Sequence, residues 1–418
     1  MIKRLWARAY LSTREDTPDG YFDFGVCQWL RGNCRSVIEI ASGRRDAIFW
    51  DETDEQLEAL KPEESYYAVL AMDGDDMGQW LSGAKAPPLL NALASQAQDY
   101  FRQRWQNGKP GLPNAEKVKR PLSPGYHASI SEALANFSLY CARPIVEMFG
   151  GQLLYAGGDD VLAMAPAANA LDCAQALQLA FRGVSPEAPD AHASLEVKRI
   201  LRDLFDYSPP VPGFITLRRS ERADVGRAEH LKPNWPLLLM GPAATASVGI
   251  AIGHVRSPMQ DVIQAARDAE KYAKSVIGKG AFCLMAHKRS GEGVGFRAQW
   301  ASGVIAVWSE LNEGVCDLSN RFAYRYTQLL KPLIIEGGSA EGARYAQKWD
   351  TTLSDAARAE LCHTLRKQGG LKSEQAILLA KEWTTKLAGA LSPRDYLHFW
   401  MTWAFVSRLV KPETHSPI

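Results

Sequence analysis

The sequence predicts an α+β fold, in which a ferredoxin-like palm is followed by an α-helical domain. Between residues 66 and 285 the expected order is strand, helix, hairpin, helix, strand, helix, strand. This order is typical of an antiparallel sheet with helices on one face. From residue 299 onward, heptad-like apolar spacing, frequent alanine and few strand patterns indicate helices instead. We therefore expect a palm at 63–298 and a helical domain at 299–418.

The elements of the palm are assigned from short apolar runs and from apolar residues spaced three and four apart. The expected strands are 66–72, 153–156, 161–164, 245–252 and 282–285, and the expected helices are 88–105, 127–149, 169–182 and 258–274. Insertions rich in proline and charge are expected at about 107–125 and 183–242. Residues 1–62 are mixed in character, and we interpret them as an interface to another subdomain.

The helical domain is predicted from five apolar-periodic segments. They cover 304–311, 321–330, 354–367, 373–390 and 393–409. Its aromatic side chains are expected in the core, and they include Trp383, Tyr396, Phe399, Trp400 and Trp403.

Composition limits the class of protein. The 418 residues are 46% hydrophobic and 23% charged, which is typical of a globular chain of two or more domains. The formal net charge of +1 argues neither for nor against a nucleic-acid partner. Seven cysteines without a Cys-x-x-Cys pair indicate neither a zinc site nor a disulfide framework, so a cytoplasmic location is expected. No apolar run is long enough to cross a membrane, and no membrane partner is expected.

The predicted hairpin carries the first candidate site. Gly157, Gly158, Asp159 and Asp160 lie between its two apolar runs. Glycines allow a ligand to approach the main chain, and adjacent carboxylates repel unless a cation faces them. Oxygen ligands of this kind suit Mg²⁺ with phosphates. The alternative is a solvent-exposed Gly-Asp turn.

A second acidic cluster follows the predicted strand at 66–72. It consists of Asp73, Asp75 and Asp76. If this strand lies beside the hairpin, Asp73 faces Asp159 or Asp160, and the carboxylates can hold two metal ions roughly 3.5–4 Å apart for nucleotidyl transfer. Asp75 and Asp76 can instead cap the next helix, which we consider the main role of Asp76.

Five motifs in one order resemble the large subunit of type III CRISPR effector complexes, the III-B form in particular. They are LAMDGDDMG at 70–78, GYHASIS at 125–131, YAGGDD at 155–160, SVGIA at 247–251 and DAEKYAK at 268–274. The resemblance covers residues 60–290 and implies a palm related to nucleotidyl and diguanylate cyclases. The family's His-Asp nuclease dipeptide and cysteine zinc knuckle are absent from this sequence. The chain therefore looks like the C-terminal part of such a subunit, either a split gene product or an excised piece, and it is expected to need the missing N-terminal half for activity.

The resemblance also implies roles for single residues. Asp73, Asp159 and Asp160 would be catalytic, and with Gly74 they would hold Mg²⁺ or Mn²⁺. The nucleotide-binding residues it implies are Gly74, Asp75, Gly157, Gly158, His127, Ser131 and Lys274. Lys274 is alternatively an ordinary surface lysine, and His127 and Ser131 are alternatively helix caps.

The implied reaction joins ATP molecules into cyclic oligoadenylates within an RNA-guided antiviral complex. The partners would be other type III effector subunits, with guide and target RNA reached through the complex. Two alternatives are a non-catalytic scaffold that binds those subunits and RNA, and a stand-alone nucleotide cyclase. Val161 stands where diguanylate cyclases have phenylalanine, which argues against the stand-alone enzyme.

Overall fold

A computed structural model describes residues 37–42, 64–106, 118–207, 212–218, 235–276, 278–314, 318, 320–336, 344–345 and 348–409. The remaining positions include most of the N-terminal segment 1–62 and most of the insertion expected at 107–125, so our predictions for those segments lie outside the described residues.

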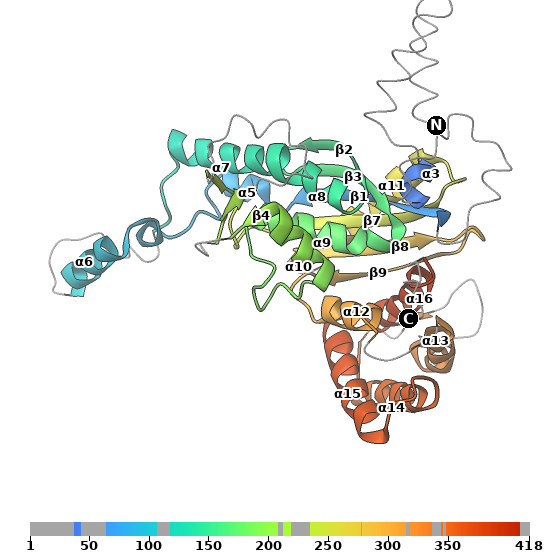
Figure 1. Ribbon diagram of the computed structural model, residues 1–418. Helices are drawn as coiled ribbons and strands as arrows, with labels where there is room; N and C mark the ends of the chain where they lie inside the picture. The colour runs from blue at the N-terminus through green and yellow to red at the C-terminus, as the bar shows by residue number, and fades with distance from the viewer. Residues whose placement is uncertain are drawn as a thin grey trace, which may run out of the picture.

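The palm is built on a six-stranded sheet in the order β2-β3-β1-β7-β8-β9 (Figure 1). Its strands are β1 (Tyr66–Gly74), β2 (Gln152–Gly157), β3 (Asp160–Pro166), β7 (Ala246–His254), β8 (Ala281–His287) and β9 (Gly293–Gln299). β1 pairs antiparallel with both β3 and β7, whereas β7 and β8 are parallel. The predicted hairpin and its place beside β1 are confirmed. β9 was not predicted, because its two glycines weaken the strand pattern.

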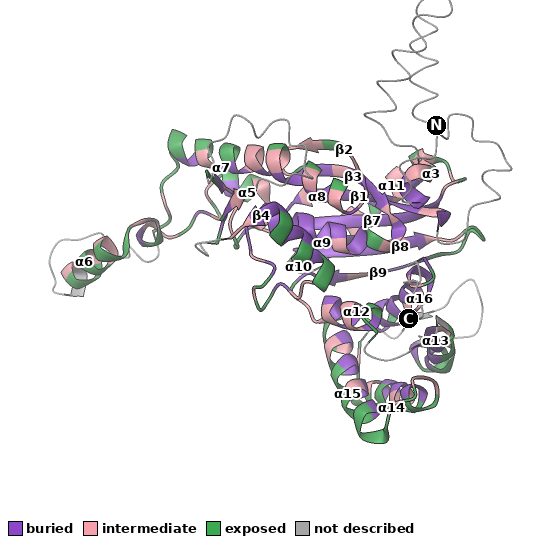
Figure 2. Cartoon of the chain, viewed as in Figure 1, coloured by how far each residue is buried: buried purple, intermediate pink, exposed green. Residues whose placement is uncertain are grey.

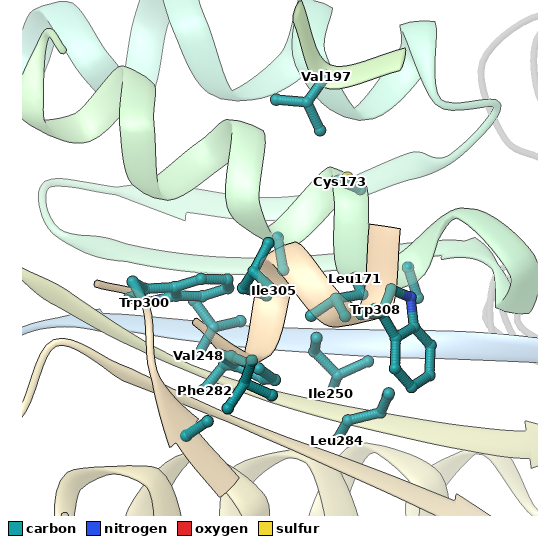
Figure 3. Packing of buried hydrophobic residues seen from close by; sticks show 14 of the residues in the cluster. Leu171, Cys173, Val197, Val248, Ile250, Phe282, Leu284, Trp300, Ile305 and Trp308 are labelled. Carbon is teal, nitrogen blue, oxygen red and sulfur yellow. The ribbon is translucent and has the colours of Figure 1, made fainter. Parts of the chain in front are cut away.

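One face of the sheet is covered by the helices just before and just after the hairpin in the sequence and by the start of the helical part. They are α7 (Pro124–Asn136), the π-helical turn Phe137–Cys141, α8 (Ala142–Met148), α9 (Ala170–Arg182) and α12 (Val304–Asn312). Figure 3 shows Val248, Ile250 and Phe282 of the sheet packed beneath α9 and α12. Burial of these large apolar side chains is the main force that holds the layers together. The central strands are almost entirely buried (Figure 2).

The opposite face is covered by α3 (Val37–Ser42) and α11 (Met259–Lys274), so the prediction of helices on one face only was wrong. Alternation along β1 explains this, because Tyr67 and Val69 point to α11 while Ala68 and Leu70 point to the first face. Gly249 of β7 lets α11 approach closely, since a Cβ there would collide with the backbone of Ala266 and Glu270.

Helix boundaries follow the capping residues. α7 begins earlier than predicted, because the Ser123 hydroxyl accepts a 3.1 Å hydrogen bond from the Tyr126 N–H and Pro124 occupies the first turn. The helix expected at 88–105 is broken in two. The 3₁₀ turn η2 (Leu89–Ala92) is followed by extended Leu93 and then by α6 (Ser95–Gln106), which projects away from the sheet (Figure 1).

The segment predicted as an insertion at 183–242 contains α10 (Leu195–Leu204) and a small separate sheet. Its strands are β4 (Phe205–Asp206), β5 (Phe214–Leu217) and β6 (Pro236–Leu238). The short helix α5 (Met77–Leu81) follows β1.

The C-terminal part is helical, as predicted. After α12 come α13 (Asn320–Ile334), α14 (Thr351–Gln368), α15 (Ser373–Ala390) and α16 (Pro393–Val406), with the short pair β10 (Ile335–Glu336) and β11 (Arg344–Tyr345) between α13 and α14. The five aromatic side chains expected in its core are all buried. α16 packs along β9, where the Phe399 and Phe296 rings lie 5.2 Å apart. The helical part is therefore joined to the edge of the palm sheet.

Asp172 in the first turn of α9 allows the burial of this helix to be tested by changing the pH. Burial raises the pKa of its carboxyl from 3.8 to about 6, and the charges of Glu196 and Glu313 add to the shift, while the hydrogen bond with Ser194 opposes it. A carboxyl with a raised pKa stabilises the fold fully below about pH 3.8, and that contribution is lost as the pH rises through 6.

We expect Asp172→Asn to raise the free energy of unfolding by about 1–2 kcal/mol near pH 8 and to change it little near pH 4. Urea denaturation at both pH values measures this. If Asp172→Asn lost the same amount of stability at both pH values, the raised pKa of Asp172 would be contradicted. That result would mean that the carboxyl acts mainly as a hydrogen-bond acceptor.

Candidate functional site

The two predicted acidic clusters meet at one end of the sheet. Carboxylate oxygens of Asp73, Asp159 and Asp160 all lie within 4.8 Å of one another. The register explains this meeting, because Met72 of β1 is paired with Val161 of β3, and Gly157 is paired with Asp160 across the hairpin. In the part of the chain that the structure describes, this is the one group of three acidic, His or Cys side chains placed to share a metal ion.

Glycines make this approach possible. A Cβ on Gly74 would lie 2.8 Å from the Asp159 Cβ, so only glycine allows the end of β1 to contact the hairpin tip. Gly158 has a φ of 69°, which favours glycine, and nothing lies within 4 Å of the position of a Cβ there. Gly157 is different, because the Tyr155 hydroxyl occupies the space that a side chain would need. The open backbone at the tip is therefore at Gly158.

The charges of these carboxylates are only partly compensated. Burial is the main cause that raises the pKa of Asp159, and the neighbouring charge of Asp160 adds to it, whereas hydrogen bonds from the backbone of Asp159 and Gly74 oppose the shift. Asp160 also raises the pKa of Glu270, after the larger effect of burial. Carboxylates that resist ionisation in this way gain from a divalent cation, and oxygen donors of this type suit Mg²⁺ or Mn²⁺.

α11 places a positively charged side chain, that of Lys274, at the site. The Lys274 ammonium forms ion pairs with Asp73 and, at 2.7 Å, with Glu270 one turn earlier on the same helix. Burial is the main cause that lowers the pKa of Lys274, and the charge of Lys279 adds to it. Lys274 therefore lies at the acidic cluster and compensates one of its charges, whereas its contact with a nucleotide stays a prediction.

Asp75 was predicted to contact a nucleotide, but its side chain is placed differently. Its side chain is buried, with Oδ1 accepting a 2.8 Å hydrogen bond from the Ser247 hydroxyl. Oδ2 accepts 2.8 Å bonds from the Thr245 hydroxyl and from the Gly280 N–H. Both oxygens are thus used by protein donors, which argues against the predicted contact of Asp75 with a nucleotide. Asp75 instead ties the end of β1 to the start of β7 and to the loop before β8.

The prediction that Asp76 caps the next helix was wrong. Asp76 occupies the N-cap position of α5, but its backbone is left-handed and its side chain forms no cap hydrogen bond. The carboxylate instead contacts Lys279 at 2.5 Å and Lys85 at 2.8 Å. The bond from Lys279 is the largest cause that lowers the pKa of Asp76, followed by that from Lys85. Two lysines therefore converge on Asp76.

His127 and Ser131 lie on exposed positions of α7. Tyr126, next to His127, donates a 2.9 Å hydrogen bond from its hydroxyl to the Trp80 carbonyl of α5. The start of α7 is therefore anchored to the helix that follows the acidic strand. Neither His127 nor Ser131 caps a helix, because the cap of α7 is Ser123.

Three charged side chains near the site were not singled out from the sequence. Glu270 is four residues before Lys274, and this helical spacing could have identified it. Lys279 lies between two glycines of positive φ, so the pattern Gly-Lys-Gly could have identified it in the sequence. Lys85 carries no such pattern, and only the tertiary structure reveals it.

Comparisons with known proteins match the part of the chain that carries the acidic cluster. Residues 66–198 match the family described as Cas10/Cmr2, second palm domain. The chain is 31% identical over 227 residues to the CRISPR system Cmr subunit Cmr2 of Pyrococcus furiosus, covering 54% of this chain and 19% of the relative. It is 42% identical over 64 residues to CRISPR system CMR subunit Cmr2 of Saccharolobus solfataricus, covering 15% and 6% respectively.

The fold is also similar to a solved structure. A chain of the type III-B Cmr-beta complex in the apo state matches with a TM-score of 0.52 and 16% identity, covering 82% of this chain and 38% of that one. The chain thus spans well under two thirds of the relatives it matches. Within the described part of the chain, no helix has both the length and the apolar content to cross a membrane.

Proposed function

Because residues 66–198 form a palm of the Cas10/Cmr2 type, we propose that this chain is the nucleotide-polymerising part of a type III-B effector subunit. Its substrate is ATP, its product is a cyclic oligoadenylate, and its partners are the other subunits with their guide and target RNA. The observation that carries the proposal is the meeting of Asp73, Asp159 and Asp160 within 4.8 Å, with Lys274 paired to Asp73.

The residues fit the chemistry of nucleotidyl transfer. Asp73, Asp159 and Asp160 would hold Mg²⁺ or Mn²⁺, which supplies charge neutralisation and a lowered pKa for the ribose 3′-hydroxyl. Lys274 is paired with Asp73 and Lys279 with the nearby Asp76, and both lysines would contact the triphosphate. The open backbone at Gly158 leaves room for a phosphate oxygen near the hairpin tip. His127 and Ser131, on the exposed face of α7, remain candidates for contact with base or ribose.

The scaffold function is the second candidate, and one observation favours it. The ion pair between Lys274 and Asp73 already neutralises one of the three metal-binding carboxylates. A site whose ligands are paired with lysine can be purely structural. Metal binding by the chain itself therefore distinguishes the two functions.

We expect Mn²⁺ to raise the melting temperature of the full chain in a concentration-dependent manner, and ATP to add to the effect. At a Mn²⁺ concentration of 100 times Kd, the expected stabilisation is about 2.7 kcal/mol. Asp73→Asn should remove most of this shift, whereas Asp203→Asn, on the exposed face of α10, should retain it. A melting temperature that does not respond to Mn²⁺ and ATP would favour the scaffold.

A further inference from the structure

Lys274 of α11 lies between two carboxylates that come from different elements. Its ammonium pairs with Asp73 at the end of β1 and, at 2.7 Å, with Glu270 one turn earlier on the same helix. Of these two carboxylates, only Asp73 belongs to the acidic cluster that is placed to share a metal ion. A divalent cation and the Lys274 ammonium therefore compete for Asp73, whereas Glu270 is left to the lysine alone.

Packing fixes Glu270 against the sheet. Gly249 of β7 is paired with Ala71 of β1, and a Cβ on Gly249 would collide with the backbone nitrogen of Glu270. α11 therefore packs tightly on β7 at this residue. The Oε1 atom of Glu270, which meets Lys274, is itself buried, so a ligand that enters from solvent does not reach it. Through this atom, Glu270 acts on a ligand only by way of Lys274.

Glu270 depends on Lys274 more than Asp73 does. The Glu270 side chain is 14% exposed, whereas that of Asp73 is 32% exposed. Burial is the main cause that raises the pKa of Glu270, and the charges of Asp160 and Asp75 add to it. Within the described residues, Lys274 is the one cation that pairs with Glu270, and a buried carboxylate without its cation is strongly unfavourable. When one of the two ion pairs must break, the pair with Asp73 therefore breaks more easily.

We propose that Glu270 is a positioning residue, which holds the Lys274 ammonium while a divalent cation occupies Asp73. Without Glu270, the ammonium has Asp73 as its only carboxylate partner and opposes the binding of the cation. With Glu270, Lys274 releases Asp73 and stays beside the acidic cluster, where its positive charge favours a triphosphate. The inference rests on the proposed function, because it assigns the residue that lets the metal and the lysine share one site.

Two simpler roles of Glu270 lead to different expectations. As an ordinary ion pair between neighbouring turns of a helix, it would affect stability but not the affinity for a metal. As a further metal ligand, it would contribute to that affinity whether Lys274 is present or absent. As a positioning residue, it contributes only when Lys274 is present. A double-mutant cycle of the two residues separates these three roles.

The measurement is calorimetric titration of the full chain with Mn²⁺ in the absence of nucleotide. Lys274→Met should tighten Mn²⁺ binding about tenfold, because the ammonium no longer competes for Asp73. Glu270→Gln should weaken Mn²⁺ binding about tenfold, because Asp73 is then the only carboxylate left to the lysine. The variant that carries both substitutions leaves neither charge buried without its partner, and it should bind Mn²⁺ as Lys274→Met does.

The matched controls are Lys271→Met and Asp268→Asn, which remove the same charges from exposed positions of α11. Each should change the Mn²⁺ affinity by less than about twofold, because solvent and salt screen exposed charges. An unchanged affinity in Glu270→Gln would reduce Glu270 to an ordinary helix pair. A double variant that binds Mn²⁺ about tenfold more weakly than Lys274→Met would make Glu270 a metal ligand. Either result overturns the proposal.

Failure of the proposed function gives a different result. In the presence of Mn²⁺, Lys274→Met should bind ATP about tenfold more weakly than the parent chain, although it binds Mn²⁺ itself more tightly. An unchanged ATP affinity, with the Mn²⁺ affinities as expected, would remove the triphosphate contact of Lys274 from the proposed function and leave the role of Glu270 intact. If the parent chain bound no Mn²⁺, Lys274→Met should bring binding into the measurable range, and its failure to do so would contradict both.

Discussion

Replacing Asp159 and Asp160 together with asparagine is expected to lower cyclic oligoadenylate formation from ATP by roughly 10³-fold. Asparagine preserves the shape of both side chains but removes two negative charges from the group that meets within 4.8 Å. Asp73 alone, already paired with Lys274, would then be the remaining charged ligand. The measurement is product formation with Mg²⁺ or Mn²⁺, with the chain assembled with the other effector subunits and target RNA.

The control for this variant is Asp355→Asn, at an exposed position of α14 where the carboxylate pairs with Arg358 one turn later on the same helix. That substitution should leave product formation unchanged. If the Asp159→Asn/Asp160→Asn variant assembles normally and keeps full activity, the acidic cluster is not the catalytic centre. Normal assembly without activity in the parent chain would instead support the scaffold function.

Asp75→Ala is expected to lower the free energy of unfolding by about 3–5 kcal/mol, the largest stability effect that we predict. The change would leave the Thr245 and Ser247 hydroxyls and the Gly280 N–H without their 2.8 Å acceptor inside the protein. It would also release the loop that carries Lys279. Urea denaturation of the full chain measures the effect.

Two further variants make the Asp75 result interpretable. Asp75→Asn keeps one carbonyl acceptor and should lose less stability than the alanine variant. Asp355→Ala should change stability by less than about 0.5 kcal/mol, as is usual for exposed positions. If Asp75→Ala were as stable as the parent chain but failed to bind ATP, Asp75 would be a nucleotide ligand after all.

Local patterns in the sequence were sufficient for much of the fold. The hairpin at 152–166 and the helices α9, α11 and α15 were predicted close to their observed bounds, because each combines clear periodicity with glycine, proline or polar residues at its ends. The meeting of Asp73 with the Asp159–Asp160 pair was also predicted, since strand ends and hairpin tips lie at the edge of a sheet. β9 was missed because pairing along β8, rather than its own pattern, makes it a strand.

The roles of neighbouring carboxylates were harder to separate. Asp73, Asp75 and Asp76 are nearly identical in sequence context, yet one joins the acidic cluster, one is buried among hydroxyls and one binds two lysines. Apart from Lys85, nine residues after Asp76, the groups that bond to these three carboxylates lie in or next to β7, in α11 and in the loop before β8, at least 170 residues later. No local spacing rule reports such distant partners.

The residue types at the strand ends can be read from the sequence, and they make a cation-binding acidic site chemically available in this chain. Three features follow instead from packing in three dimensions: the carboxylates that remain open to a cation, the helices on both faces of the sheet, and the pairing of Lys274 with Asp73. Secondary structure depends on neighbours along the chain, whereas charge compensation and packing depend on neighbours in space.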